Sequence, residues 1–316
     1  MADKKIIAVV GSTGAQGGGL VQALLNDPSG GFAVRAITRD PSKDKAKAIA
    51  AKGGEVVKAD TDDVESLKKA FAGAYGVFAV TNFWEHFSVD REQQQAKNMA
   101  AAAKAAGVKH VVWSTLEDVR KEIPLSDDRM PTLQGKYKCP HFDSKGSIDH
   151  VFTESGVPTT FLLASFYWDN FYMFGMGPKK NDDGTYTLTF PIGNAKMPGI
   201  AADDIGKVAY GIFKRGSEYF GKYVGAAGEH ITGAGMAAEL SKQMGANVKF
   251  YAPDPAEYRG YGFPGAEDLG NMFQYYHDFE NAFCNRRPVE KAKELAGGSL
   301  KTFSQWLSQH KAQVVS

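Results

Sequence analysis

The stretch "IIAVVGSTGAQGGGLVQALL", residues 6–25, decides the fold. An apolar run over 6–10 meets three glycines at a spacing of three, Gly11, Gly14 and Gly17, and an amphipathic segment follows them. This order is typical of a buried strand, a tight turn and a helix. Glycines at this spacing let the backbone turn sharply and approach a pyrophosphate, which then sits on free N–H groups at the start of the helix. We therefore predict a dinucleotide-binding turn.

The first half of the chain continues the alternation of short apolar runs and helical segments. The predicted strands are 6–10, 33–38, 55–59, 76–81 and 111–114, and the predicted helices are 18–25, 43–51, 62–72 and 89–106. Nearly continuous apolar runs are typical of parallel strands that are covered on both faces. Repeated βαβ units imply right-handed crossovers. We predict an α/β fold of the Rossmann type, with a doubly wound parallel sheet.

The second half is predicted to add a smaller lobe. A long loop over 117–140 comes first, and loops of this length inside compact domains are often functional. A helix at about 142–155 and a strand at 160–164 follow, and the strand is expected to belong to the main sheet. We predict a nucleotide-binding domain over 1–160 and an α+β lobe over 161–316 for a substrate or partner.

Charge and composition exclude several classes of protein. The 37 Lys and Arg residues balance 36 Asp and Glu residues, so no net field favours nucleic acid or an acidic membrane surface. Two cysteines, Cys139 and Cys284, are too few for a disulfide framework or a zinc site, and no metal is expected. The chain has no apolar run of the length that a membrane span or signal peptide needs. We expect a cytoplasmic protein without a direct nucleic-acid or membrane partner.

The end of the second predicted strand bears on the choice of dinucleotide. It reads "AITRD", residues 36–40, with Arg39 where NAD sites place an acid and with Lys43 and Lys45 close by. A guanidinium can bind a 2′-phosphate through two hydrogen bonds, whereas Asp40 comes one position too late to bind the ribose. We predict that NADP(H) is preferred over NAD(H). The alternative is that Arg39 is an ordinary solvated residue.

Two further strand ends are expected to line the dinucleotide. Asp60 and Thr61 follow the third strand, and Thr81, Asn82 and Phe83 follow the fourth. Ligands of doubly wound folds bind outside the carboxyl ends of the parallel strands. The first pair is therefore placed near the adenine, and the second group beside the ribose and pyrophosphate.

The catalytic pattern of short-chain dehydrogenases is incomplete. These enzymes pair a tyrosine acid with a lysine in Tyr-x-x-x-Lys, and a serine after the fifth strand orients the carbonyl of the substrate. Ser114 and Lys145 fit the serine and the lysine, but His141 stands in the tyrosine slot, and Tyr137 is eight residues before the lysine. Lys145 is predicted to bind the nicotinamide ribose, unless it is an exposed helix lysine. His141 is either a proton donor or a helix-start residue without chemical duty.

Two more features leave alternatives open. The aromatic run over 166–174, which includes Tyr167, either lines a nicotinamide or substrate pocket or packs the small lobe. Cys139, next to Pro140, is either a redox-sensitive thiol or a buried inert one.

Several segments together resemble the NmrA-like family, atypical relatives of the short-chain dehydrogenases. They are VVGSTGAQGGGL (9–20), TRDP (38–41), VTNFWE (80–85), HFDSKG (141–146), FYWDN (166–170) and GFPGAEDLGNMFQYY (262–276). The resemblance runs over about 4–310 and is greatest to the NADPH-sensor type of vertebrates. It implies an NADP(H) site made of Gly11, Ser12, Thr13, Gly14, Ala15, Gln16 and Gly17 at the diphosphate, Arg39 and Lys43 at the 2′-phosphate, Asp60 and Thr61 near the adenine, and Thr81, Asn82, Phe83, Lys145, Tyr167, Trp168, Asp169 and Asn170.

The resemblance also implies a function. Members of this type lack the catalytic tyrosine, as this chain does at His141, and are described as sensors of the NADPH/NADP ratio that change their contacts with partners. The partners expected here are a transcription regulator or another signalling protein, and a second copy in a homodimer, with the nucleus as a second compartment. Two departures from the family pattern are Asp44, where a basic residue is usual, and the length of the 117–140 loop.

Two hypotheses follow, and the sequence does not decide between them. The first is a redox sensor or regulator that binds NADP(H). The alternative is an NADPH-dependent reductase of a small carbonyl, enone, imine or quinone, with a proton from His141, Ser114 or Tyr167. Whether the chain is an enzyme therefore stays open.

Overall fold

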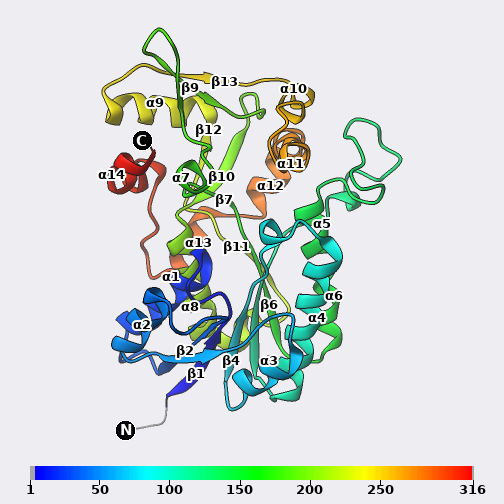
Figure 1. The fold of residues 1–316 in the computed structure, drawn as a ribbon, viewed down its shortest axis with the longest axis vertical. Coiled ribbons are helices and arrows are strands. Elements are labelled where there is room, and N and C mark those ends of the chain that lie inside the picture. Colours follow the sequence, from blue (N-terminus) through cyan, green and yellow to red (C-terminus); the bar gives the residue numbers. More distant parts are fainter. Residues whose placement is uncertain (1–3, 315–316) are drawn as a thin grey trace.

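The computed structural model describes residues 4–314 and contains a seven-stranded parallel sheet in its lower half (Figure 1). The strands of this sheet are β1 (Lys5–Val9), β2 (Phe32–Thr38), β3 (Glu55–Lys58), β4 (Gly76–Ala79), β5 (His110–Thr115), β6 (Thr159–Leu163) and β11 (Tyr223–Gly225). Their order is β11-β6-β5-β4-β1-β2-β3, with every neighbouring pair parallel. The predicted doubly wound sheet is confirmed, and its first five strands begin and end within two residues of the predicted bounds.

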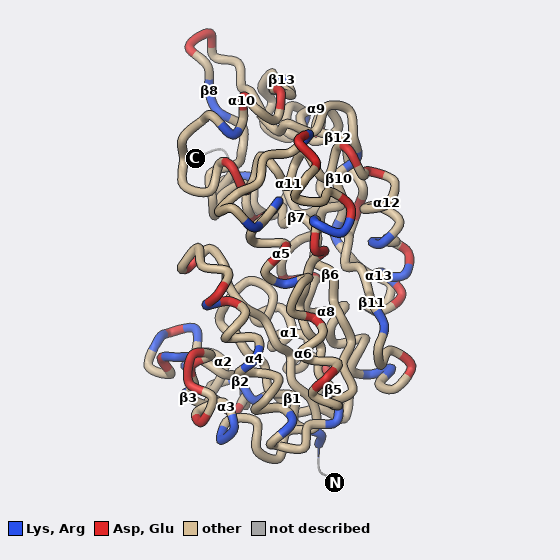
Figure 2. Tube along the Cα trace, turned by 90° about the vertical axis from the view of Figure 1, so that its right-hand side faces the viewer, with Lys and Arg blue, Asp and Glu red and all other residues tan. Residues whose placement is uncertain are grey.

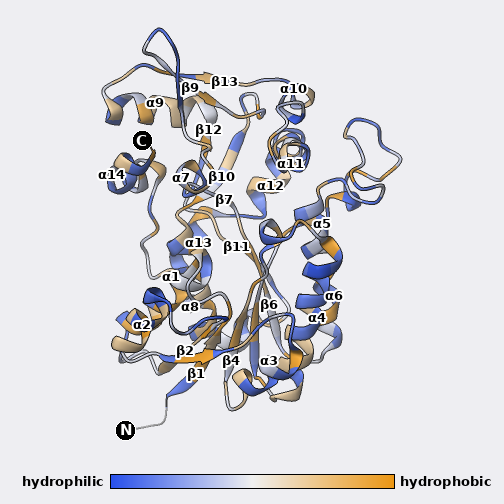
Figure 3. Cartoon of the chain, viewed as in Figure 1, coloured by the Kyte–Doolittle hydropathy of each residue, from blue (hydrophilic) through white to orange (hydrophobic). Residues whose placement is uncertain are grey.

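Helices cover both faces of this sheet (Figure 1). One face packs against α1 (Ala15–Asn26), α2 (Asp44–Ala51), α8 (Ala202–Arg215) and α13 (Val289–Leu295). The other face packs against α3 (Val64–Phe71), α4 (Val89–Ala105) and α6 (Asp149–Glu154). These helices carry apolar residues on the side toward the sheet and polar residues outside, as the mixed colours of Figure 3 show. Each face of the sheet therefore has its own buried core.

The predicted helix over 142–155 is wrong in one respect, because the chain forms two short helices there. They are α5 (Pro140–Gly146) and α6, with a break at 147–148. A Cβ atom at Gly146 would lie 2.2 Å from the backbone nitrogen of Asp118, so the end of α5 touches the segment that follows β5. This contact places the end of α5 beside the sheet. Before α5 begins at Pro140, the predicted 117–140 loop contains only the short 3-10 helix η2 (Val119–Lys121) and an isolated bridge between Leu133 and Tyr137, and it is a loop as predicted.

The small lobe lies above the carboxyl ends of the strands (Figure 1). Its two sheets have the orders β12-β10-β7 and β13-β9-β8. The strands are β7 (Phe166–Tyr167), β8 (Lys179–Lys180), β9 (Tyr186–Thr189), β10 (Lys196–Ile200), β12 (Glu229–Thr232) and β13 (Val248–Tyr251). The helices are α7 (Asn170–Met173), α9 (Gly233–Met244), α10 (Pro255–Arg259), α11 (Ala266–Asp278), α12 (Glu280–Asn285) and α14 (Phe303–Val314), and two 3-10 helices, η1 (Phe83–Glu85) and η3 (Gly216–Tyr219), complete the chain.

Charge is evenly distributed over this architecture. Lys and Arg alternate with Asp and Glu in the loops of both lobes, as the tube in Figure 2 shows. Among residues 4–314, no helix is both long enough and apolar enough to cross a bilayer.

Candidate functional site

The glycine turn joins β1 to α1 at the carboxyl edge of the sheet. Gly11 has a φ of +64°, which favours glycine, and its carbonyl accepts a 2.9 Å hydrogen bond from the N–H of Gly14. A Cβ atom at Gly17 would lie 2.4 Å from the carbonyl oxygen of Gly11, so only glycine fits there. No side chain in the described chain caps the first turn of α1 at Gly14. Free N–H groups at this helix start are a ready site for an anion.

Two polar side chains of the turn form hydrogen bonds with other parts of the protein. Ser12 is buried and donates a 2.8 Å hydrogen bond to the carbonyl of Ile37, which holds the turn against β2. Gln16 donates a 2.5 Å hydrogen bond to the hydroxyl of Tyr167 on β7. The turn is therefore fastened both to the neighbouring strand and to the small lobe.

Two lysines lie beside the turn, and a third cation, Arg39, follows β2. Lys43 and Lys45, with Thr13 and Asp44, line a pocket of about 350 Å³, and Lys45 Nζ donates a 3.3 Å hydrogen bond to the carbonyl of Thr13. Arg39, at the end of β2, is 60% exposed and forms an ion pair with Glu85 of η1. This carboxylate raises the pKa of the Arg39 guanidinium, which stays charged. The charge of Arg39 is thus balanced by a carboxylate, and the role of these cations at a 2′-phosphate stays a prediction.

The next two strand ends lie at the same edge. The backbone N–H of Asp60 donates to the Ser66 hydroxyl at 3.0 Å, and the carbonyl of Thr61 accepts a 2.9 Å hydrogen bond from Asn98. Asn82 is exposed after β4, whereas Phe83 is buried. The backbone that carries these residues is held in place by helices α3 and α4.

Lys145 is buried and is held by β4 and α4. Its ammonium group donates to the Thr81 hydroxyl at 2.5 Å and to the Thr81 carbonyl at 3.3 Å, and it lies 2.9 Å from Glu92 Oε1. The hydroxyls of Thr81 and Ser144 both donate to the Glu92 carboxylate. The sequence predictions missed Glu92. An acid on the sheet-facing side of an alanine-rich helix was the available signal, because buried carboxylates are rare unless paired.

His141 begins α5 and contacts the small lobe through Asp268 of α11. Asp268 Oδ1 accepts a 2.7 Å hydrogen bond from the ring Nδ1–H, and Oδ2 accepts a 3.1 Å bond from the backbone N–H of His141. The ring centroid lies 4.7 Å from that of Trp84, which follows β4. Within residues 4–314, no hydrogen bond is found for the other ring nitrogen, Nε2. Asp268 was also missed as a functional candidate, although it lies in a segment that resembles the family.

Cys139 shares the carboxylate of Asp268. Its sulfur lies 3.1 Å from Asp268 Oδ1 and 3.6 Å from the Nδ1 of His141, so that three donor atoms lie within 4.8 Å of one another. Burial, and then the charge of Asp268, raise the pKa of this thiol well above its usual value. A protonated buried thiol is both a poor nucleophile and a poor metal ligand.

The remaining candidates divide between the turn and the lobe core. Ser114 is buried within β5. Tyr167 lies beside Gln16 of the turn, and burial raises the pKa of its phenol. Trp168 is fully buried, and its ring packs against Phe303 and Trp306, so this side chain belongs to the core of the lobe. Tyr167 therefore contacts the turn through Gln16, whereas the Trp168 ring contacts aromatic residues of the small lobe.

The neighbours of Trp168 also have structural partners. The carboxylate of Asp169 accepts hydrogen bonds from the N–H of Ala202 at 2.8 Å and from the Tyr172 hydroxyl at 2.7 Å. It therefore satisfies a free N–H at the start of α8. Asn170 is the first residue of α7.

Known proteins resemble this chain over nearly its whole length. The NmrA-like family domain-containing oxidoreductase FrzB of Cladobotryum sp. is 31% identical over 306 residues, which cover 90% of this chain and 88% of FrzB. NmrA, a negative transcriptional regulator, superposes in its NAD complex with a TM-score of 0.77 and in its NADP complex with 0.76, each at 21% identity and covering 96% of this chain and 94% of NmrA. The triphenylmethane reductase of Citrobacter sp., complexed with NADP(H), superposes with a TM-score of 0.72 at 21% identity, covering 96% and 99% of the two chains.

At such identities, the solved structures show a shared fold, which agrees with the seven-stranded sheet described above. The sequence evidence reaches further. Residues 3–307 match the model of the NmrA-like family, and the chain therefore belongs to that family.

Proposed function

We propose that this chain binds NADP(H), in preference to NAD(H), at the carboxyl edge of its main sheet and reports the NADPH/NADP ratio to a protein partner. The observation that carries the binding proposal is the pair of lysines, Lys43 and Lys45, beside a glycine turn whose N–H groups are free, with the exposed Arg39 just after β2. A 2′-phosphate is the part of NADP that needs such cations. NmrA in complex with NAD or NADP, and triphenylmethane reductase in complex with NADP(H), support a dinucleotide at this edge.

The ion pair of Arg39 suggests how binding is sensed. Exposed ion pairs contribute only about 0–1 kcal/mol, so a doubly charged phosphate can replace Glu85 as the partner of Arg39. Glu85 belongs to the segment 82–87, which we call the bridging segment. Its Trp84 contacts the His141 ring and lies against Gly265, where a Cβ atom would be 2.9 Å from the indole ring. If Glu85 is released from Arg39, we expect the bridging segment to shift. This shift would change the contacts of Trp84 with α5 and with the start of α11.

The tyrosine of the Tyr-x-x-x-Lys pair is replaced by His141, which favours a sensor over an enzyme. In this proposal, Lys145 binds the nicotinamide ribose and Asp60 and Thr61 lie near the adenine. The proposed partner is a transcription regulator or another signalling protein. The chain is proposed to form a homodimer and to act in the cytoplasm and in the nucleus.

Titration calorimetry with NADPH, NADP, NADH and NAD tests the binding proposal. Because Arg39 would bind the 2′-phosphate by charge-assisted hydrogen bonds, Arg39→Glu is expected to weaken NADPH binding by roughly 10- to 100-fold and NADH binding little. Glu85→Gln is the matched variant: it frees Arg39 and should leave NADPH binding equal or tighter. Equal losses of NADPH and NADH affinity in Arg39→Glu would contradict a role of Arg39 at the phosphate.

Hydrogen exchange with bound NADPH and bound NADP tests the sensing proposal. We expect the bridging segment and the start of α11 to differ in protection between the two complexes, because a sensor must distinguish the reduced from the oxidised nicotinamide. Because NADPH and NADP carry the same 2′-phosphate, release of Glu85 reports the binding of either form, and Glu85→Gln should reduce the change in protection between the free and the bound chain. The difference between the two complexes has to come from the nicotinamide end, through the contact of Trp84 with the His141 ring. The same protection pattern in both complexes would leave binding intact but rule out sensing by this route.

The alternative function, an NADPH-dependent reductase of a small carbonyl, enone, imine or quinone, is favoured by one observation. Asp268 orients the ring of His141, four residues before Lys145, and its Nε2 has no partner among residues 4–314. An imidazole held at one nitrogen by a carboxylate is suited to proton transfer at the other. The curated relative FrzB is named an oxidoreductase.

A turnover screen with these four substrate classes tests the alternative. If the chain is a reductase that uses His141, His141→Gln should lower kcat by about 100-fold or more, and the exposed His150→Gln should not. Unchanged turnover in a His141→Ala, Tyr167→Phe double variant, and in Ser114→Ala, would remove these three proton donors. Absence of turnover with all four classes would favour the sensor.

A further inference from the structure

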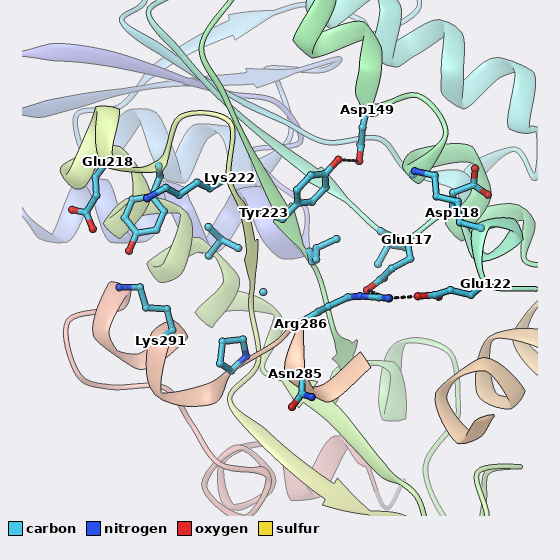
Figure 4. A pocket seen from close by; sticks show the side chains of 18 residues that line it. Glu117, Asp118, Glu122, Asp149, Glu218, Lys222, Tyr223, Asn285, Arg286 and Lys291 are labelled. Atoms are coloured by element: carbon cyan, nitrogen blue, oxygen red, sulfur yellow. Dashed lines mark hydrogen bonds and ion pairs between the residues drawn. The ribbon is translucent and has the colours of Figure 1, made fainter. Parts of the chain in front are cut away.

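A pocket of about 620 Å³ lies beside β11, the edge strand of the main sheet (Figure 4). Three strands separate β11 from β1, which leads into the glycine turn. Leu163, Tyr223 and Val224 form its apolar part, and the segments after β5 and α12 form its sides. The volume is in the range of small-molecule sites. None of the residues assigned above to the dinucleotide lines this pocket.

The acidic side chains that line this pocket already have partners. Four of them form ion pairs, Glu117 with Arg287, Asp118 with Arg120, Glu122 with Arg286 and Glu218 with Arg215. The fifth, Asp149, accepts hydrogen bonds from Trp113, Thr115 and Tyr223 at 2.6–3.0 Å. Burial raises the pKa of Asp149 to about 6. These carboxylates are therefore not free to hold a cationic ligand.

The lysines of the pocket are less well balanced. Lys121 and Lys222 form no ion pair within residues 4–314, and Lys291 pairs only with Glu294, one turn away on its own helix, at 3.0 Å. Lys222 and Lys291 lie 5.6 and 5.7 Å from the centroid of the Tyr219 ring, so both ammonium groups approach the same phenol. The uncompensated charge of the pocket is positive.

The phenol of Tyr219 supplies an unused donor at this place. Tyr219 is only 4% exposed, and its hydroxyl has no hydrogen-bond partner in the described chain. The ammonium group of Lys291 comes close enough to donate to the Tyr219 oxygen, which raises the pKa of the lysine, but the O–H proton of the phenol itself still has no acceptor in the described chain. Buried hydroxyls without a partner are uncommon, because the lost hydration is not replaced. A ligand oxygen in the pocket would provide the missing acceptor.

An exposed aromatic ring forms the opposite part of the pocket. The side chain of Tyr223 is 56% exposed, and it stacks on Phe161 with ring centroids 4.7 Å apart. Its hydroxyl is bonded to Asp149, as Figure 4 shows, so the ring is held in one orientation. A rigid exposed ring of this kind is a platform for a flat apolar group.

We propose that this pocket binds a small organic anion, whose carboxylate, sulfonate or phosphate group is held by Lys222, Lys291 and the Tyr219 hydroxyl and whose flat apolar body lies on Tyr223. The site does not depend on the NADP(H) proposal, and either can fail without the other.

Fluorescence titration with anilinonaphthalene sulfonate, on the full chain with saturating NADP, tests the proposal. Lys222→Gln/Lys291→Gln should raise the Kd at least tenfold. The control Lys179→Gln/Lys180→Gln, on exposed β8, should leave it unchanged. Phenylnaphthylamine, which has the same aromatic body without the sulfonate, should bind both variants equally. Thermal unfolding shows whether each variant is folded.

A second variant separates the hydroxyl from the charges. Tyr219→Phe keeps the ring under both lysines and should raise the Kd for the sulfonate several-fold, with no change for phenylnaphthylamine. An unchanged sulfonate Kd in Lys222→Gln/Lys291→Gln, probe binding that is found only when NADP is left out, or no binding by the wild type would each overturn the proposal.

Discussion

The two most prominent candidate residues, Lys145 and His141, are each oriented by one carboxylate. Glu92 holds Lys145 at the end of β4, and Asp268 holds His141 at the start of α5. Both carboxylates are buried, and each accepts more than one hydrogen bond, as buried charges require. In the candidate site, acidic residues that are distant in the sequence therefore orient the cationic and aromatic side chains.

A buried histidine makes a pH-dependent prediction. His110 in β5 is fully buried, its Nε2 lies 2.8 Å from the Thr160 hydroxyl, and burial lowers its pKa from 6.5 to about 4. The unfolded chain therefore binds a proton at a higher pH than the folded chain does. The stability contributed by neutral His110 is complete above pH 6.5 and is lost as the pH falls toward 4, by at most about 3 kcal/mol.

Urea unfolding of the wild type and of His110→Gln at about pH 7.5 and about pH 5 measures this effect. The difference in unfolding free energy between wild type and variant should shrink by about 1–2 kcal/mol at the lower pH. Asp143 and Asp149, whose pKa values burial raises to about 6, act in the opposite direction but are present in both proteins. A difference that is constant with pH would contradict a depressed pKa for His110.

At the scale of elements, the glycines of α1 have two separate tasks. Gly17 allows the close approach to Gly11 in the turn, whereas Gly19 allows α1 to cross α8. A Cβ atom at Gly19 would lie 2.2 Å from the carbonyl oxygen of Asp203, and one at Gly206 would lie 2.0 Å from the backbone nitrogen of Leu20. The glycine-rich start of α1 thus serves the nucleotide turn on one side and helix packing on the other.

Alanine substitutions at Gly17 and at the neighbouring Gly18 separate the steric role of Gly17 in the turn from the general effect of glycine on helix stability. Gly17→Ala should unfold at lower temperature and lose most NADPH affinity, because the new methyl group would lie 2.4 Å from the Gly11 oxygen. Gly18→Ala is the matched control, since its Cβ would lie 3.6 Å from the nearest atom, and it should stabilise the helix by about 0.5–1 kcal/mol. Thermal unfolding and calorimetry measure both. Similar NADPH affinity in the two variants would contradict the role of Gly17.

The residues before and after position 160, the predicted domain boundary, share the main sheet and one of its hydrophobic cores. The edge strand β11 and the helix α8 come from the second half, yet one pairs with β6 and the other packs on α1. The core on that face combines Leu20 and Leu24 of α1 with Ile205 and Val208 of α8. The two-domain division stays a prediction, and the main sheet draws on residues from both sides of its boundary.

A fragment of residues 1–160 tests this interdependence. Without α8, the apolar side of α1 would be exposed to water, and we expect the fragment to aggregate or to lack a cooperative unfolding transition. The full chain is the control, and circular dichroism with size-exclusion chromatography is the measurement. A monomeric fragment that unfolds cooperatively would show that the first domain is independent.

The parallel strands, the glycine turn and the family could be predicted from the sequence, because each depends on patterns a few residues long. The period of apolar runs predicted β1 to β6, and the spacing of Gly11, Gly14 and Gly17 has the steric cause expected of it. Arg39 was also predicted to lie beside this turn, from its place at a strand end.

Which side chains contact one another depends on the packing of distant segments. The pairs Arg39–Glu85, Lys145–Glu92 and His141–Asp268 join residues separated by 46, 53 and 127 positions, and no local pattern encodes such contacts. The burial of Trp168, the place of β11 at the edge of the main sheet and the approach of two lysines to the Tyr219 ring follow from packing between distant segments. Periodicity tells which face of an element is buried, but not which partner covers it, since that depends on how all the elements fit together.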